Sequence, residues 1–198
     1  MNTFELAGAT VRLEPLTAAH LPHLIGEAAD PALWEFTFQT NPFVSEASAA
    51  AWLDAARTPD VRAFAIVDRA TAAVAGSTRF FDIDAANRKC EIGWTFLLRR
   101  FWRSHVNSET KLLLLQYGFE TWGASRIQFK AEAINRRSHA ALLRIGATHE
   151  GTMRSFRIRP GGDVRDVNLY SIIAAEWPAL KARLLSFAEQ NPDSRAAG

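Results

Sequence analysis

Apolar and polar residues alternate along several short stretches of the chain, as they do in strands that bury one face. The clearest stretch is Arg126–Ala131, where Ile127 and Phe129 alternate with polar neighbours. The same alternation, bounded by turn residues, predicts six further strands. They span Val11–Glu14, Arg62–Asp68, Ala73–Phe81, Lys89–Phe96, about Ala147–Ile158 and Val164–Ile173.

Helices are predicted where apolar residues recur on one face behind a capping residue. They begin after Thr17 (to about Ala28), after Ser45 (Glu46–Arg57), at Asn107 or Ser108 (to about Trp122), after Asn135 (to Gly146) and near Glu176 (to about Phe187). Helices thus alternate with strands, while the hairpin turn at 160–163 excludes a purely parallel sheet. The pattern predicts an α/β (mixed α+β) fold, with helices on both faces of a mixed sheet.

Composition adds limits on size and compartment. The chain has 198 residues and a net charge of +2. We expect one domain over residues 1–190, with a frayed tail at 191–198. Cys90 is the single cysteine, so it makes no disulfide within the chain, and its alternation with Ile92, Trp94 and Phe96 predicts a buried strand face rather than a nucleophile. Without a signal-like start or an apolar run long enough to span a bilayer, the chain reads as cytoplasmic.

The most informative segment is residues 92–119, where an apolar strand runs into an arginine-rich turn and then a helix. A helix start exposes backbone N–H groups and the positive end of a dipole, and therefore favours anions. Arg99, Arg100 and Arg103 lie in the turn just before this helix. The segment predicts a site for a phosphate-bearing cofactor. If the next strand, Arg126–Ala131, lies alongside, the helix start at Asn135 opens at the same edge of the sheet.

These pieces together resemble a known family. VRLEPLTAAHL, EIGW, NSETKLLLLQYGFE, NRRSHAALLRIGATHEG and RDVNLYSIIAAEW occur in the order and spacing of the GCN5-related N-acetyltransferases (GNAT). Within them, the chain resembles the RimJ/RimL branch, which acetylates ribosomal-protein N-termini. The resemblance covers almost the whole chain. It implies a mostly antiparallel sheet of about seven strands, with acetyl-CoA bound where two parallel strands splay apart. No metal is expected, because no histidine–carboxylate spacing in the sequence suggests one.

The resemblance also implies which residues hold acetyl-CoA. The thioester carbonyl would be held by backbone N–H groups among Phe96, Leu97 and Leu98. Loop and helix-start amides would hold the pyrophosphate, with an arginine such as Arg100 or Arg103 on the 3′-phosphate and Asn135 on the pantetheine arm or capping its helix. The loop residues are Arg103, Ser104, His105, Val106, Asn107 and Ser108, and Arg99 is the third arginine that could pair with the 3′-phosphate.

The cofactor loop departs from the family pattern Q/R-x-x-G-x-G/A. Trp102 stands at its first position, and His105 and Asn107 replace its two glycines. Glycine suits such a loop through close backbone approach and permissive torsions. The departure favours one alternative, a catalytically impaired GNAT-fold protein with a binding or regulatory role.

For catalysis, Glu91 is the first candidate base, acting through a water from a face shared with Gly93 and Thr95. A salt-bridged strand glutamate is the plainer alternative, and Glu150 is a second candidate. Leu142 stands where many relatives carry an acidic tyrosine. The resemblance therefore implies Ser138 as the group near the departing sulfur.

The implied reaction is direct attack by a primary amine, from a protein N-terminus or a small molecule, within a ternary complex. Residues 34–43 and the alternating Asp166, Asn168 and Tyr170 are candidate groove walls, with packing and strand-tying as alternatives. A third reading is nucleic-acid binding through the arginines of Met153–Arg159. No membrane partner is expected, and the resemblance leaves a homodimer open.

Overall fold

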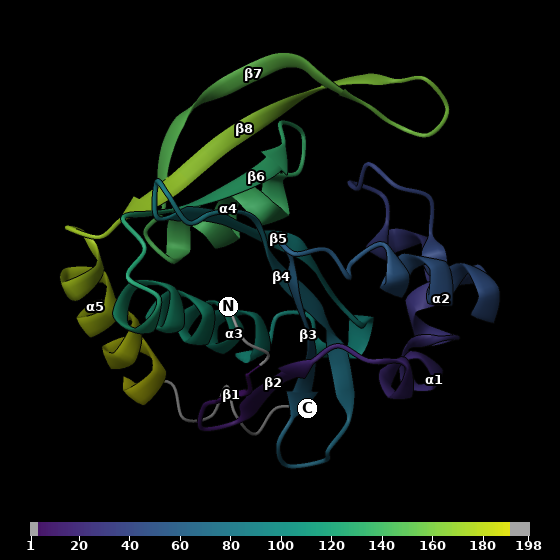
Figure 1. Cartoon of the computed structure of the whole chain (residues 1–198), viewed down its shortest axis with the longest axis horizontal. Coiled ribbons are helices and arrows are strands. Elements are labelled where there is room, and N and C mark those ends of the chain that lie inside the picture. Colours follow the sequence, from purple (N-terminus) through teal and green to yellow (C-terminus); the bar gives the residue numbers. More distant parts are fainter. Residues whose placement is uncertain (1–3, 191–198) are drawn as a thin grey trace.

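Eight strands form one sheet in the computed structural model, which describes residues 4–190 (Figure 1). The order across the sheet is β1-β2-β3-β4-β5-β6-β8-β7, and every neighbouring pair is antiparallel except β5 and β6. The strands are β1 Leu6–Ala7, β2 Val11–Pro15, β3 Arg62–Asp68, β4 Val74–Asp84, β5 Lys89–Leu97, β6 Arg126–Glu132, β7 Thr148–Ile158 and β8 Val164–Ile173.

The predicted strands are therefore confirmed. The additional strand, β1, has two residues, which is too short for any alternation to reveal it. The predicted end of β4 at Phe81 was too early, because the strand continues to Asp84. The predicted tail at 191–198 lies outside the described residues.

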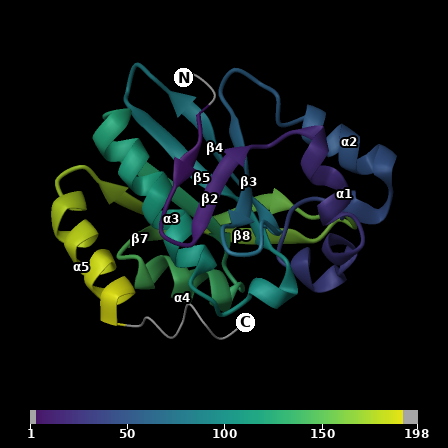
Figure 2. The same cartoon turned by 90° about the horizontal axis from the view of Figure 1, so that it is seen from below.

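Helices cover both faces of the sheet, and two apolar clusters separate them. α1 (Leu21–Leu24) and α2 (Glu46–Asp54) pack with Phe96 and Leu98 on one face. α3 (Val106–Gln116), α4 (Arg136–Arg144) and α5 (Trp177–Gln190) pack on the other. Figure 2 shows the two groups of helices on opposite sides of the central strands.

Two helix predictions need correction. The first helix stops at Leu24 because the chain turns through Gly26, whose φ is +99°. α3 begins at Val106 behind His105, not behind Asn107 or Ser108, because the Ser104 hydroxyl accepts the Val106 N–H (3.3 Å) and starts the helix earlier. After Gln116, the predicted helix continues only as a π-helical turn, Tyr117–Thr121.

The parallel pair β5 and β6 separates after a short seam. Pairing covers only Lys89, Cys90 and Glu91 of β5, which lie opposite Arg126, Ile127 and Gln128. β5 runs on to Leu97 and β6 to Glu132 without pairing to each other within the described chain. The sheet therefore has a wedge-shaped opening between these two strands.

A β-bulge in β5 changes which side chains face each side of the sheet. Arg79 of β4 lies opposite Gly93 and Ser77 lies opposite Phe96, so the bulge holds one extra residue around Trp94, whose φ is +51°. The prediction that Thr95 shares a face with Glu91 was consequently wrong. Thr95 instead faces α3, where Lys111 donates to its hydroxyl.

The same bulge corrects the prediction that Trp94 and Phe96 share the face of Cys90. Cys90 and Ile92 are buried on the α3 side as expected. Phe96 packs on the α1–α2 side instead, and Trp94 is 39% exposed. An inserted residue reverses the alternation for everything after it.

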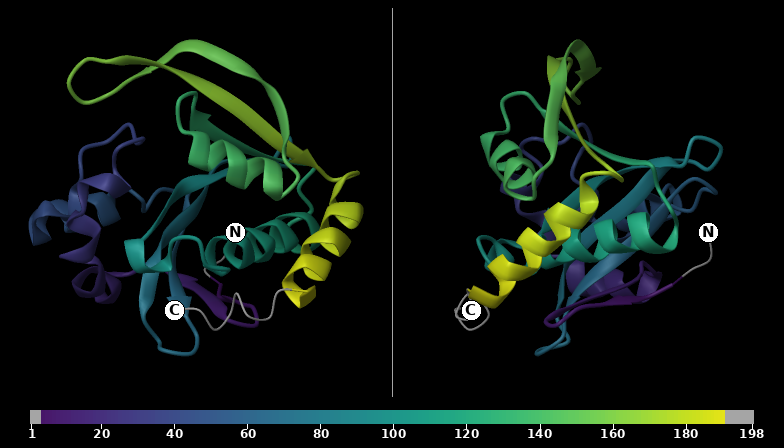
Figure 3. Two further views of the ribbon diagram at one scale, coloured as in Figure 1. Left: turned by 180° about the vertical axis from the view of Figure 1, so that it is seen from behind. Right: turned by 90° about the vertical axis from the view of Figure 1, so that its left-hand side faces the viewer.

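The β7–β8 hairpin extends away from the rest of the sheet toward the segment before α2 (Figures 1 and 3). Arg157 lies 5.6 Å from the ring centroid of Phe38, and Arg159 lies 6.0 Å from that of Phe36. These cation–π contacts join two segments that are far apart in sequence.

Candidate functional site

A cavity of about 1310 Å³ occupies the opening between β5 and β6. Its walls come from both strands, the loop before α3, the first turns of α3 and α4, the 33–39 segment and the β7–β8 hairpin. Asn107 and Ser108 of α3 and Asn135 and Ser138 of α4 all line it. The expectation that both helix starts open at one edge is thus confirmed.

The structure separates the residues predicted to hold the cofactor into two groups. Most line the cavity: Phe96, Leu97, Arg103, Ser104, His105, Asn107, Ser108 and Asn135. Leu98, Arg100 and Val106 are not among the residues that line it. Leu98 and Val106 are buried in the two apolar clusters, while Arg100 pairs with Glu27. Contact of these three residues with the cofactor stays a prediction.

The backbone of β5 presents one amide of the predicted three to the opening. Leu98 N–H donates to the Ala75 carbonyl of β4 at 2.8 Å. Backbone groups of successive strand residues point to alternate sides, so the Leu97 N–H points toward β6, where pairing has ended. The Leu97 carbonyl accepts the Trp102 indole N–H at 2.7 Å. A polar ligand atom in the opening would meet the Leu97 N–H.

The loop before α3 adopts its shape without glycine. His105 is the N-cap residue of α3, with a helical φ of −65° and ψ of −19°. The left-handed torsion falls at Arg103 instead, with a φ of +61°. The glycine replacements at His105 and Asn107 therefore create no torsional conflict. Arg103 is exposed, and its guanidinium has no ion-pair partner among the side chains described.

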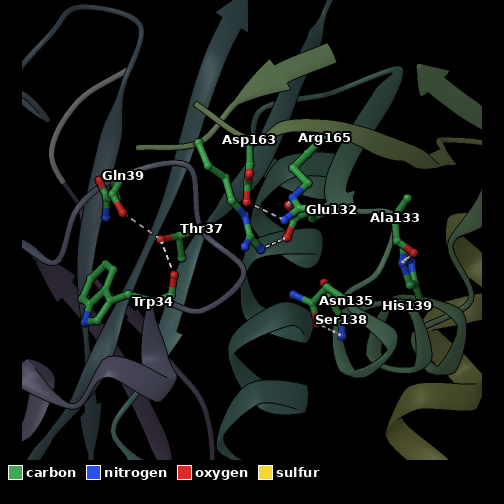
Figure 4. Close-up of polar contacts among 11 residues, drawn as sticks. Trp34, Thr37, Gln39, Glu132, Ala133, Asn135, Ser138, His139, Asp163 and Arg165 are labelled. Carbon is green, nitrogen blue, oxygen red and sulfur yellow. Dashed lines mark hydrogen bonds and ion pairs between the residues drawn. The ribbon is translucent and has the colours of Figure 1, made fainter. Parts of the chain in front are cut away.

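The start of α4 is tied to the same cavity. The Asn135 carboxamide accepts the Ser138 N–H at 3.0 Å, so Asn135 is an N-cap as predicted (Figure 4). Arg137 stacks on the Trp102 ring at 4.1 Å and joins α4 to the loop before α3. The Ser138 side chain is partly buried at the cavity wall.

Glu91 lines the cavity and is 3% exposed. Its carboxylate accepts hydrogen bonds from Lys130 Nζ (2.6 Å) and the Gln128 amide (3.0 Å). Burial raises the pKa of Glu91 and Lys130 opposes that rise. Glu91 is therefore both salt-bridged and in the cavity, so the two readings of this residue are compatible.

Glu132, at the end of β6, is a second buried carboxylate of the cavity that the sequence reasoning missed. Arg159, just after β7, pairs with it. Arg165 of β8 lies 3.4 Å from it (Figure 4). The acid holds the hairpin over the cavity. Strand alternation was the available signal, but Glu132 lies just beyond the alternating stretch.

Lys111 is the other residue that the sequence reasoning missed. It is 7% exposed, lines the cavity from α3 and donates to the Thr95 hydroxyl at 2.8 Å. Burial lowers the pKa of Lys111 to about 7. The leucines that follow Lys111 give the helix its apolar pattern, and nothing in that pattern indicates that the lysine itself is buried.

The titration of Lys111 predicts how stability depends on pH. Between about 7 and 10.5 the unfolded chain carries a proton that the folded chain lacks. The free energy of unfolding should then rise with pH in this window, by up to about 1.4 kcal/mol per pH unit. Chemical denaturation across the window should show this rise, and Lys111→Met should remove it. An equal slope in both proteins would contradict the prediction.

Several other polar side chains make structural contacts. Glu150 lies outside the cavity lining and pairs with Arg126 while accepting the Ser171 hydroxyl (2.6 Å), and these contacts lower its pKa to about 2. His139 bonds the Tyr170 hydroxyl (2.7 Å) and the Ala133 carbonyl (3.1 Å). Asp166 and Asn168 accept from Ser155 and Thr152 of β7. The strand-tying alternative is therefore the one observed.

Within residues 4–190, no three or more His, Cys, Asp or Glu side chains gather where they could hold a metal ion. Over the same residues, no helix combines the length and apolar character that crossing a membrane requires.

Comparison with known proteins shows which family the sequence and the fold are similar to. The model of the acetyltransferase (GNAT) domain matches residues 10–148. An uncharacterized N-acetyltransferase of Bacillus subtilis (strain 168), YoaA, is 31% identical over 105 residues, which are 53% of this chain. The chain covers 58% of that relative's length.

Solved structures agree on the fold. A GCN5-related N-acetyltransferase from Brucella melitensis is 31% identical, with a TM-score of 0.87 over 94% of this chain and 86% of that chain. The microcin C7 self-immunity acetyltransferase MccE, solved with acetyl-CoA and AMP, is 20% identical, with a TM-score of 0.75 over 84% of this chain and 93% of its own. At that identity the likeness shows the fold alone.

Proposed function

Because the chain belongs to the GNAT acetyltransferase family, we propose that it is an acetyl-CoA-dependent N-acetyltransferase of the RimJ/RimL type. Its acceptor is a primary amine. The observation that carries the proposal is the meeting of a strand amide, Leu97, and the start of α3 in one cavity. The acetyl-CoA bound by the related fold of MccE supports this choice of acyl donor.

The chemistry of the cavity suits acetyl-CoA. The first turn of α3 offers backbone N–H groups to a pyrophosphate. In the loop before it, Arg103 is a cation without an ion-pair partner within residues 4–190. The Leu97 N–H is placed to hold a thioester carbonyl and to stabilise negative charge that develops on its oxygen. Asn135 and Ser138 approach from the opposite wall. When bound, acetyl-CoA supplies an activated acetyl group.

Glu91 is the proposed base for the acceptor amine. An α-amine has an ordinary pKa of about 8, so only modest help is needed to remove its proton near neutral pH. The raised pKa of Glu91 makes its carboxylate a stronger base than an exposed glutamate. Lys130 and Gln128 fix the carboxylate toward the cavity, and a water relays the proton. Ser138 remains the proposed hydrogen-bond donor on the α4 side.

The acceptor enters between the 33–39 segment and the β7–β8 hairpin. Thr37 holds this segment by donating to the Trp34 carbonyl (3.0 Å), and Gln39 lies beside it (Figure 4). Phe36, Phe38 and Arg157 line the cavity there. An aromatic and cationic entrance accommodates a protein N-terminus or a small-molecule amine.

Two other readings have weaker support. The impaired-enzyme reading rested on His105 and Asn107, and His105 has an ordinary helical torsion. The nucleic-acid reading rested on three arginines, of which Arg157 lies over Phe38 and Arg159 pairs with Glu132. Calorimetry with acetyl-CoA, followed by an amine screen for CoA release, tests the proposal. The absence of binding at millimolar acetyl-CoA would contradict it.

Replacing Arg103 tests the phosphate end of the site. Arg103→Ala should weaken acetyl-CoA binding about tenfold, because a charge-assisted contact with phosphate is lost. Calorimetric Kd values for wild type and variant measure the effect. Arg100→Ala is the matched control, since Arg100 lies outside the cavity lining and pairs with Glu27. An equal loss of acetyl-CoA affinity in both variants would contradict the prediction, because the effect would then come from the loss of any nearby positive charge.

A further inference from the structure

Lys111 places an amine at the floor of the opening between β5 and β6, on the sheet face opposite Glu91. Its Nζ lies 2.8 Å from the Thr95 hydroxyl of β5 and 5.8 Å from the ring centroid of Phe129 of β6. Both strands have separated at this level. The tip of Lys111 therefore lies between the strands, two residues along β5 from the Leu97 amide.

No carboxylate neutralises this amine, since none lies within 4 Å of Lys111 Nζ among the side chains described. The three carboxylates that line the same cavity are occupied by other partners. These pairs are Glu91 with Lys130, Glu109 with Thr10, and Glu132 with Arg159. The other titratable or cationic side chains of the cavity wall are Arg103, His105, Lys130, Arg137, Arg144 and Arg157. Burial of an unpaired ammonium is costly, which disfavours a purely structural lysine here.

The hydrogen-bonding capacity of Lys111 is largely unused. An ammonium has three donors, and the Thr95 hydroxyl takes one. The Thr95 hydroxyl is also bonded to that of Thr78 at 2.8 Å, which fixes it as a partner. The remaining donors of Lys111 are available to a group in the cavity.

We propose that Lys111 is the catalytic acid that protonates the CoA sulfur as it departs. This inference rests on the proposed acetyl transfer. The acceptor nitrogen forms the new C–N bond to the acyl carbon, the C–S bond breaks, and its electron pair moves onto sulfur. Lys111 Nζ gives its proton to that sulfur and becomes neutral. Glu91 removes the surplus proton from the acceptor nitrogen, and exchange with water returns both groups to their starting states.

The chemistry of the alternatives favours Lys111. Tyrosine is absent from the usual place, where Leu142 stands, and the serine hydroxyl of Ser138 is a very weak acid. A thiol has an ordinary pKa of about 8.5, and an acid with a pKa near neutrality transfers its proton to such a thiolate readily. Burial lowers the pKa of Lys111 to about 7. Ser138 then orients the sulfur from α4 while Lys111 supplies the proton from α3.

The first test is kinetic. Lys111→Met, which keeps the unbranched stem of the side chain and removes the amine, should lower kcat about 100-fold while changing the Kd of acetyl-CoA less than about threefold. The wild-type kcat should fall as pH rises above neutrality, and the variant should lose this fall. Thr95→Val removes the hydroxyl that accepts from Lys111 and favours its ammonium form. In this variant kcat should therefore begin to fall at a lower pH than in the wild type. Lys181→Met is the control, because Lys181 pairs with Glu120 away from the cavity.

The second test does not depend on turnover. The ultraviolet absorbance of the thiolate reports ionisation of CoA bound to the protein. Cys90 does not interfere, since burial raises the pKa of its thiol to about 12. Because a neighbouring thiolate stabilises the ammonium form of Lys111, bound CoA should ionise at lower pH in the wild type than in Lys111→Met.

An unchanged kcat in Lys111→Met, or the same thiol ionisation in both proteins, would overturn the role of Lys111 and leave the proposed function standing. Mass spectrometry showing an acetyl group on Lys111 during turnover would overturn it too, because Lys111 would then be a nucleophile. Failure of the wild type to bind acetyl-CoA would remove the proposed function itself, and with it this role.

Discussion

Glu91→Gln should lower kcat about 100-fold and leave the Kd of acetyl-CoA unchanged. The amide keeps the size of the side chain and its contacts with Gln128 and Lys130, but it cannot accept the proton of the acceptor amine. Since burial raises the pKa of Glu91 above its ordinary value of 4.5, the wild-type kcat/KM should fall with decreasing pH at a point above 4.5. Steady-state kinetics across pH measures both effects.

Two further variants sharpen this expectation. Lys130→Met removes a cation that lowers the pKa of Glu91, so the fall in kcat/KM should move to higher pH. Glu150→Gln is the matched control, because Glu150 is an ion-paired carboxylate outside the cavity lining. Its kcat should stay within about twofold of the wild type. If Glu91→Gln turned over at the wild-type rate, Glu132 would become the better candidate for the base.

Gly76→Ala should cost about 3 kcal/mol of folding free energy, a loss of roughly 6–12 °C in Tm. A Cβ at Gly76 would lie 2.0 Å from the Phe96 carbonyl oxygen and 3.0 Å from Leu97 Cα. These are backbone atoms of β5, which cannot move aside as a flexible side chain can. Relief of the clash must displace the strand that carries the Leu97 amide, so acetyl-CoA binding should weaken as well. Thermal unfolding and calorimetry measure the two losses.

Gly123→Ala is the control for the backbone contribution alone. Gly123 has a φ of +75°, and a Cβ there would meet no heavy atom within 4 Å. The substitution should cost about 1 kcal/mol through backbone strain and leave acetyl-CoA binding intact. Equal destabilisation by the two substitutions would argue that the contact with β5 is not what requires glycine at position 76.

The strands were predictable because alternation and turn residues agree along most of the chain. Arg126–Ala131 and the hairpin around residues 160–163 are examples where local preference and global packing point the same way. The bulge at Trp94 was not predictable, because Trp and Thr are ordinary strand residues and carry no bulge signal. One extra residue then reversed the predicted faces of Thr95 and Phe96.

The candidate site was predictable where it depends on helix starts, and less so where it depends on long-range pairing. Asn135 and the loop before α3 are local signals, and both line the cavity. The ion pair of Arg100 with Glu27 was not predictable, because sequence spacing does not reveal that Glu27 lies within reach. Lys111 was missed because its significance comes from burial beside Thr95, a residue that only the bulge turns toward α3.

The short seam between β5 and β6 has a mechanical consequence. One leaf of the molecule, β1 to β5, is bonded to the other, β6, β8 and β7, through three residue pairs of parallel strand. A molecule wedged between the leaves and bonded to each would act as a partial ninth strand, restoring continuity where the sheet itself has none. Binding of such a molecule would therefore also restrict the motion of the two halves of the sheet relative to each other.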